Sequence, residues 1–111
     1  MKARWLNNTI MATALMFACQ AGATEDAAAF KALAKKKGCF NCHRMDKPVL
    51  GPSLEDIGRK YGKDAGAPDR LFKVIRNGSK GGVWGAAAMP RYAGLSDDEI
   101  SLMVRYILSL K

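Results

Sequence analysis

The chain has 111 residues, which is enough for one small domain and too few for two. A core of that size stabilises a fold by only about 3–5 kcal/mol, so a disulfide, a metal or a cofactor is expected to help. The 18 Lys and Arg residues against 10 Asp and Glu give a net charge of +8, which excludes an acidic surface and suits nucleic acid, anionic lipid or an acidic protein as partner.

The N-terminal segment is typical of a secretory signal peptide. Lys2 and Arg4 form a positive start, an almost wholly apolar run follows at residues 10–18, and Ala21-Gly22-Ala23 fits the A-x-A cleavage pattern. The apolar run is shorter than the roughly 18–20 residues of a membrane-spanning helix, so an uncleaved anchor is the weaker alternative. We therefore expect export to the periplasm and cleavage after Ala23.

Cleavage at that position would leave one domain, residues 24–111, after a signal peptide of residues 1–23. Removing Lys2 and Arg4 from the 18 basic residues leaves 16 against 10 acidic ones, a net charge of +6. Export makes nucleic acid a poor candidate, so we expect the basic surface to meet an acidic protein. We also expect a monomer with no small-molecule substrate.

Two helices are predicted in the first half of the domain, and no strand is predicted anywhere in it. The first, residues 26–37, places its apolar side chains on one helical face and ends at Gly38. The second, residues 54–61, follows Ser53 as a candidate N-cap.

Two more helices are predicted on either side of a long loop, residues 78–95. Pro68 suits the first turn of a helix that closes at Asn77-Gly78. The last helix opens with the capping box Ser96-Asp97-Asp98-Glu99. Its predicted buried stripe consists of Ile100, Met103, Val104 and Ile107. The loop between them is rich in glycine, and such loops in small domains are usually functional. The pattern predicts an all-α domain wrapped around a bound group.

Cys39-Phe40-Asn41-Cys42-His43 is the C-x-x-C-H signature of covalent haem attachment. The spacing lets two thiols reach the two vinyl groups on one edge of the porphyrin, while the adjacent imidazole lies under the iron. A zinc site would need further ligands, and residues 24–111 contain no other Cys or His. A catalytic dithiol would need a strand-helix-strand context. We therefore predict one haem c, bound through Cys39 and Cys42, with His43 as an iron ligand.

The second ring nitrogen of His43 needs an acceptor that fixes the orientation of the imidazole. A backbone carbonyl in the Gly51-Pro52 turn is a candidate, and the alternative is that Pro52 only makes this turn rigid.

Three methionines follow the predicted signal peptide and are candidates for the other axial position. Met45 is too close to His43 in the chain to reach the opposite haem face, and Met103 lies on the apolar stripe of the last helix. Met89 lies in the glycine-rich loop, which Pro90 stiffens. We expect Met89 to bind the iron, the alternative being that it only packs against the porphyrin. Two filled axial positions leave no site for O₂ or peroxide, so we expect one-electron transfer and no enzymatic activity.

With these residues in place, the chain resembles the small bacterial class I cytochromes c of the cytochrome c-551/c-552 type over nearly all of residues 24–111. The stretches that carry the resemblance are Lys36–Cys39 with Cys42-His43, Gly51-Pro52, Asn77–Ser79 with Val83–Gly85, Met89-Pro90, Leu95–Glu99 and Tyr106–Ser109. C-x-x-C-H alone indicates only c-type haem, whereas this ordered set is specific to the family. The resemblance implies a fold of four or five short helices around one covalent haem.

The resemblance also implies roles for individual residues. The Pro52 carbonyl would accept a hydrogen bond from His43, and Trp84 would donate one to a haem propionate, the alternative for Trp84 being a core aromatic. The first and last helices would cross near Gly38 and Tyr106. Members of this family shuttle electrons between respiratory complexes and terminal oxidases, nitrite reductases or peroxidases.

Two features depart from the family. Arg91 and Tyr92 stand where many members have an asparagine that binds the methionine sulfur, and the basic residue often offered to a propionate has no clear equivalent near Val74. Two other functions stay open, namely a dedicated subunit or donor of one dehydrogenase or reductase, and a haem-based gas sensor in which Met89 dissociates.

Seven lysines are candidates for a basic rim that steers an acidic redox partner. They are Lys35, Lys36, Lys37, Lys47, Lys60, Lys63 and Lys80. For any one of them, a solvated residue that only maintains solubility is the simpler interpretation.

Overall fold

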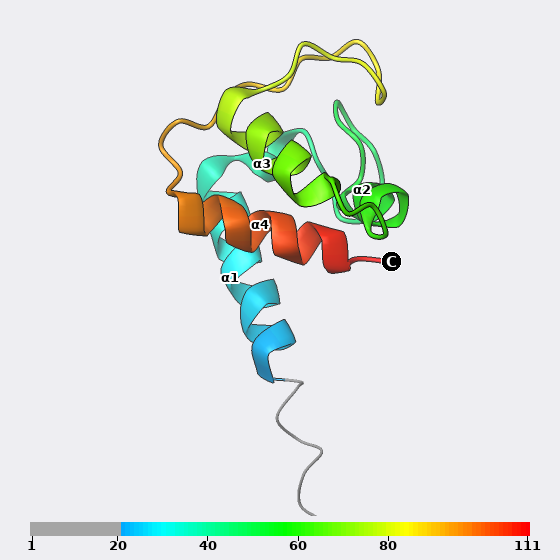
Figure 1. Cartoon of the computed structure of the whole chain (residues 1–111). Coiled ribbons are helices and arrows are strands. Elements are labelled where there is room, and N and C mark those ends of the chain that lie inside the picture. The colour runs from blue at the N-terminus through cyan, green and yellow to red at the C-terminus, as the bar shows by residue number, and fades with distance from the viewer. Residues whose placement is uncertain (1–20) are drawn as a thin grey trace, which may run out of the picture.

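The computed structural model describes residues 21–111, and these form four α-helices and one short 3₁₀ helix with no β-strand among them (Figure 1). The elements are α1 (Ala21–Lys37), η1 (Cys39–Asn41), α2 (Leu54–Tyr61), α3 (Ala67–Asn77) and α4 (Asp97–Ser109). The predicted all-α class is confirmed. No helix within this part of the chain has the length and apolar character needed to span a membrane. Most of the predicted signal peptide, residues 1–20, lies outside the described residues.

Helices α1 and α4 cross each other at the bottom of the molecule as drawn in Figure 1. The rings of Phe30 and Tyr106 stack at the crossing with their centroids 4.5 Å apart. Arg105 donates two hydrogen bonds to the carboxylate of Asp26, at 2.8 and 3.1 Å. Tyr106 therefore contacts Phe30. The crossing was expected near Gly38, which lies about two helical turns further along the chain.

The start of α1 differs from the prediction, because the helix begins at Ala21 and not at Asp26. The alanines before Asp26 are strong helix formers, so the helix can extend through them. The Asp26 carboxylate, which would suit a helix start, is instead paired with Arg105. The predicted cleavage point after Ala23 thus lies within the first turns of α1.

The core is centred on α4, against which the other three helices pack. Its buried members are Phe30, Ala34, Leu54, Ile57, Ile75, Leu95, Ile100, Met103, Val104 and Ile107. The predicted stripe on α4 is confirmed. Gly58 lets α2 approach the end of α4, because a Cβ there would lie only 2.4 Å from the Leu110 carbonyl oxygen.

Side-chain caps fix where α2 and α4 begin, as predicted. The Ser53 hydroxyl accepts a hydrogen bond from the Asp56 amide at 3.0 Å. Ser96 and Glu99 form a complete capping box, with bonds of 2.8 and 3.2 Å. Helix α3 begins at Ala67, with Pro68 in its first turn, and ends at Asn77 before Gly78. These three helices have the ends that local sequence signals predicted.

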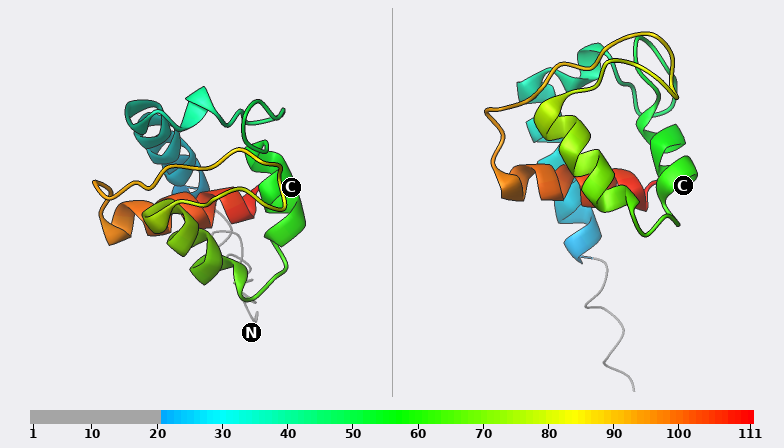
Figure 2. Two further views of the ribbon diagram at one scale, coloured as in Figure 1. Left: turned by 90° about the horizontal axis from the view of Figure 1, so that it is seen from above. Right: turned by 45° about the horizontal axis from the view of Figure 1, so that its top comes forward.

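The loop between α3 and α4 is a narrow, hairpin-like excursion (Figure 2). Ser79 and Met89 exchange two backbone hydrogen bonds of 2.9 Å. Further out, Gly82 and Gly85 exchange bonds of 2.8 and 3.0 Å, both with positive φ angles that favour glycine. The turn at the tip brings Trp84 over to α2, where its ring meets that of Tyr61 edge-on at 6.2 Å.

Candidate haem site

The segment Cys39–His43 forms one tight turn directly after α1. Gly38 has a φ of 78°, a left-handed conformation that ends the helix and redirects the chain. The amides of Cys42 and His43 both donate to the Cys39 carbonyl oxygen, at 3.2 and 2.9 Å. The turn therefore holds both cysteines and the histidine in one compact unit.

Cys39 and Cys42 are free cysteines, and both are half-buried. Burial raises the pKa of the Cys39 thiol, so this thiol stays protonated at neutral pH. Catalytic dithiols show the opposite behaviour, since their nucleophilic cysteine has a lowered pKa. The environment of Cys39 thus argues against a dithiol oxidoreductase and fits a thiol that is consumed in a permanent thioether bond.

The imidazole of His43 is fixed from the loop that follows it. Its Nδ1 lies 2.8 Å from the carbonyl oxygen of Pro52, at hydrogen-bond distance. The Gly51 amide donates to the Cys42 carbonyl at 2.9 Å and so ties this loop to the attachment turn. An Nδ1–H that donates to Pro52 leaves Nε2 as the nitrogen available to a metal ion. This is the geometry that the predicted role of Pro52 requires.

Gly51 was not predicted as a site residue, yet it lies against the ring of His43. A Cβ on Gly51 would come within 2.7 Å of Cε1 and 3.0 Å of Nδ1 of that ring. The signal in the sequence was a glycine next to the proline of the expected turn, but sequence does not reveal the close approach.

The three methionines occupy different environments. Met103 is 2% exposed in the core of α4, and Met45 packs against the core from the loop after His43. Met89 is half-buried on the long loop, and its backbone is fixed by the two bonds to Ser79. Of the three, Met89 is therefore the methionine on the long loop between α3 and α4. No described hydrogen bond links it to the segment Cys39–His43.

Tyr92 stands at the position where the family often has asparagine. Its amide donates to the Ile75 carbonyl at 3.0 Å, and its side chain packs against the core. Burial raises the pKa of the Tyr92 phenol, and Cys39 and Cys42 raise it further. The phenol is therefore a protonated donor close to the attachment turn.

Several large apolar side chains are exposed on the two loops that flank the attachment turn in the fold. They are Val49, Leu50, Val83 and Trp84, the last with 42% of its surface exposed. A cavity of about 650 Å³ lies beside the attachment turn and is lined by Phe40, Arg44, Met45, Asp46, Lys47 and Val49. None of the predicted haem ligands lines this cavity, so the fit to a large, flat, mainly apolar group such as haem rests on the two free thiols, the oriented imidazole and the exposed apolar side chains.

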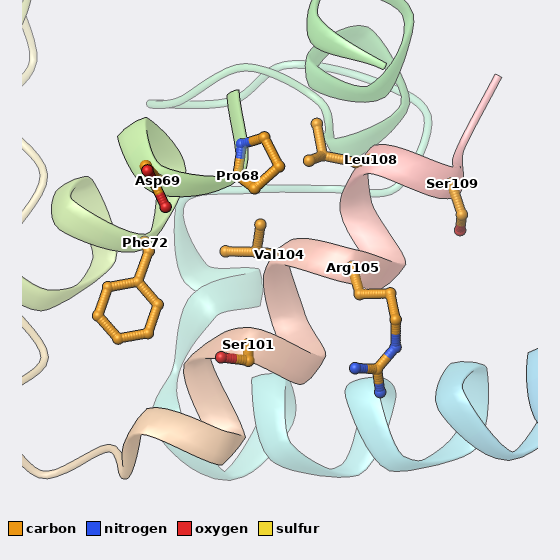
Figure 3. Close-up of a pocket in the computed structure, with 8 residues that line it drawn as sticks. All are labelled: Pro68, Asp69, Phe72, Ser101, Val104, Arg105, Leu108 and Ser109. Atoms are coloured by element: carbon orange, nitrogen blue, oxygen red, sulfur yellow. The ribbon is translucent and has the colours of Figure 1, made fainter. Parts of the chain in front are cut away.

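A second groove, of about 480 Å³, lies between α3 and α4 (Figure 3). Its lining includes Phe72, Val104 and Arg105, and Figure 3 shows Arg105 at its edge. The guanidinium of Arg105 is already paired with Asp26. None of the predicted haem ligands lines this groove, so it is separate from the candidate site.

Residues 21–111 hold no cluster of three or more His, Cys, Asp or Glu side chains arranged for a metal ion. A zinc site built from the C-x-x-C pair therefore lacks its other ligands in this part of the chain.

Comparison with known proteins gives a consistent family. Residues 25–107 match the family described as cytochrome C oxidase, cbb3-type, subunit III. The chain is 40% identical to cytochrome c-552 of Nitrosomonas europaea over 111 residues, which span both chains completely. It is 38% identical to cytochrome c-551 of Pseudomonas aeruginosa over 103 residues, 93% of each chain.

Solved structures agree with these relatives. The crystal structure of Nitrosomonas europaea cytochrome c552 matches with a TM-score of 0.68 and 40% identity, over 73% of this chain and 99% of that one. The class 1 cytochrome MtoD from Sideroxydans lithotrophicus ES-1 matches with a TM-score of 0.65 and 31% identity, over 76% of this chain and 95% of that one.

Proposed function

Because the chain belongs to the small bacterial class I cytochromes c of the c-551/c-552 type, which carry electrons on a covalent haem c, we propose that it is a periplasmic one-electron carrier whose iron is bound by His43 and Met89. The observation that supports this most directly is the His43 ring, which follows the two attachment cysteines and donates from Nδ1 toward Pro52. That hydrogen bond makes the imidazole a more basic ligand and keeps Nε2 directed to one place.

Each residue of the site has a distinct task in this proposal. Cys39 and Cys42 hold the porphyrin permanently, and Pro52 orients His43. Met89 supplies a neutral thioether from a loop whose backbone is fixed by Ser79. Trp84 donates its indole N–H to a propionate. The haem, when bound, supplies a one-electron couple, and thioether ligation favours its reduced form and so raises the reduction potential.

The location and processing of the chain belong to the same proposal. A signal peptide of residues 1–23 would direct export, and residues 24–111 would form the mature cytochrome. The basic surface would meet the acidic docking surfaces of redox proteins, such as a respiratory complex, an oxidase, a nitrite reductase or a peroxidase. Opposite charges raise the rate of encounter without demanding tight binding, which suits a shuttle.

A test of attachment is the mass of the exported protein. We expect the mass of residues 24–111 plus one haem that resists extraction by acidified acetone. Haem that extracts freely would refute covalent binding, and a mass that retains residues 1–23 would show that the signal is not cleaved.

Ligation by Met89 is tested with a pair of methionine variants. Met89→Ala should abolish the weak charge-transfer band of ferric iron bound to thioether sulfur and should open the iron to added ligands such as cyanide. Met103→Leu is the matched control, since it replaces a 2%-exposed core residue with one of similar volume and should cost less than about 1.5 kcal/mol of stability. If Met103→Leu lost the band and Met89→Ala kept it, the two assignments would have to be exchanged.

A second candidate function is a cytochrome dedicated to one enzyme complex. The matched family is described as a subunit of a cbb3-type oxidase, which favours this alternative over the gas sensor. Co-purification of the chain with a single membrane complex at physiological salt would support it. Recovery as a free monomer that reduces several acceptors would support the shuttle.

A further inference from the structure

Two aromatic rings and a lysine from separate parts of the chain meet where the long loop reaches α2. The Nζ of Lys60 lies 5.7 Å from the centre of the Tyr61 ring and 5.8 Å from that of Trp84. The two rings stand edge-on, 6.2 Å apart, at an angle of 82°. We refer to Lys60, Tyr61 and Trp84 as the loop-tip cluster.

The charge of Lys60 has no acidic partner in this cluster. Within residues 21–111 the four ion pairs all involve arginines, and none involves Lys60. Arg70 also lies near Tyr61, 5.3 Å from the ring centre, but its charge is balanced by Asp64. Lys60 is therefore a cation without a carboxylate partner in the described residues, and its Nζ lies close to both rings of the cluster.

The indole of Trp84 is in a similar position. Its ring is only partly covered by Tyr61, and in the described part of the chain its N–H makes no hydrogen bond. With 42% of its surface exposed, the indole leaves its N–H accessible to a carboxylate from outside the loop. The loop-tip cluster thus presents a charged donor and a neutral donor next to each other, with no acceptor for either.

The residues near Val74 do not supply an alternative cation. Arg76 donates to the Leu95 carbonyl at 2.9 Å and pairs with Asp97, so its guanidinium is engaged in joining α3 to the start of α4. Lys73 is exposed on α3 and makes no contact with either ring of the cluster in the described structure. A basic residue that pairs with a haem propionate would therefore have to come from another part of the chain.

We propose that Lys60 supplies a positive charge to the haem propionate to which the proposed function already assigns the N–H of Trp84. This inference rests on the proposed function, because the carboxylate is brought by the covalently attached haem. Tyr61 acts as the positioning residue, since its ring contacts both partners and holds the loop tip against α2.

The charge at Lys60 has two measurable consequences. A nearby cation stabilises the ionised carboxylate, so it lowers the pKa of the propionate. A positive charge near the iron also favours the reduced state. Removing Lys60 should therefore lower the reduction potential at neutral pH and move the propionate ionisation, seen as a pH dependence of that potential, to higher pH.

The test is the midpoint reduction potential as a function of pH for the full holoprotein and four variants. Lys60→Gln should shift the redox-linked ionisation upward by about half a pH unit, the size expected for an exposed ion pair. Lys60→Arg should restore the wild-type profile, and Trp84→Phe should shift it in the same direction as Lys60→Gln. Lys73→Gln is the matched control, because it removes the same charge from another exposed helical lysine and should leave the ionisation in place.

Covalent haem and the thioether band are recorded on every sample before the potential is measured. Equal shifts in Lys60→Gln and Lys73→Gln would overturn the inference, because they would show only a general charge effect. An unmoved ionisation in Lys60→Gln with haem and band intact would overturn it as well and would leave the proposed function standing. Absence of covalent haem from the wild type would instead overturn the proposed function.

Discussion

The absence of a side chain at Gly51 leaves room for the imidazole of His43 in its observed orientation. A Cβ at this position would lie 2.7 Å from Cε1 of the ring, closer than real side chains approach. The requirement is steric, since Gly51 is not among the glycines with a positive φ angle. A residue that appears to be a simple turn glycine is thus part of the ligand geometry.

We expect Gly51→Ala to push the ring away from Pro52 or to displace the turn. Overpacking of this kind usually costs about 1–3 kcal/mol, and here it should also weaken the Nδ1–Pro52 hydrogen bond. The expected result is a lower yield of holoprotein and a shifted absorption of the ferric haem. Gly94→Ala serves as the control, because a Cβ there meets nothing within 4 Å. Equal yields from the two variants would show that the ring tolerates a methyl group at Gly51.

At the residue scale, the sequence predicted the attachment motif and the Pro52 carbonyl beside His43, but not the contacts of Gly51 and Lys60. C-x-x-C-H specifies Cys39, Cys42 and His43 because the chemistry imposes their spacing. The contacts of Gly51 with His43 and of Lys60 with Trp84 join separate segments of the chain. No local pattern encodes such contacts, which depend on how the loops return to the helices.

At the element scale, the helix starts that were predicted carry local signals, namely the caps Ser53 and Ser96 and the first-turn proline Pro68. Ser53 and Ser96 accept amide hydrogen bonds three residues later, so their signals are wholly local. The start of α1 was predicted wrongly, because the helix already includes the residues from Ala21 to Glu25. The long loop was predicted to be irregular, but the Ser79–Met89 pairing within it could not be read from the glycines.

The capping box of α4 should contribute measurably to the stability of the whole domain, because α4 contacts all the other α-helices. We expect Ser96→Ala to lower the free energy of unfolding by about 1 kcal/mol in denaturant titration. Ser101→Ala, an exposed position within α4, should be neutral or slightly stabilising, since alanine is the better helix former. Similar losses in both variants would mean that the Ser96 hydroxyl is not acting as a cap.

At the scale of the whole molecule, the distribution of charge bears on function. The last turn of α1 carries Lys35, Lys36 and Lys37, directly before the attachment turn. Lys35 and Lys36 are exposed, whereas Lys37 is half-buried. Of these three lysines of the predicted basic rim, Lys35 and Lys36 are therefore the more accessible to a partner. Exposed charges act at long range and are screened beyond about 8 Å at physiological ionic strength.

We therefore expect the bimolecular rate with an acidic redox partner to fall as salt rises. Lys35→Glu combined with Lys36→Glu should lower the low-salt rate further and leave the absorption spectrum unchanged, because neither lysine is asked to touch the iron. The control combines Lys73→Glu with Lys111→Glu, which makes the same change in net charge away from the end of α1. A rate that is indifferent to salt in the wild type would exclude electrostatic steering without affecting the haem assignment.

The crossing of α1 with α4 also determines the order in which the fold can be completed. Asp26 and Arg105, which join the two helices, are 79 positions apart in the chain. A chain that is translocated from its N-terminus delivers Cys39–His43 long before Asp97–Ser109, so α1 has no partner while the attachment turn emerges. Domains fold as cooperative units, and the core centred on α4 cannot close until the last helix arrives. If the chain is exported as proposed, both thiols would be accessible for haem attachment during this interval, before α4 packs against α1.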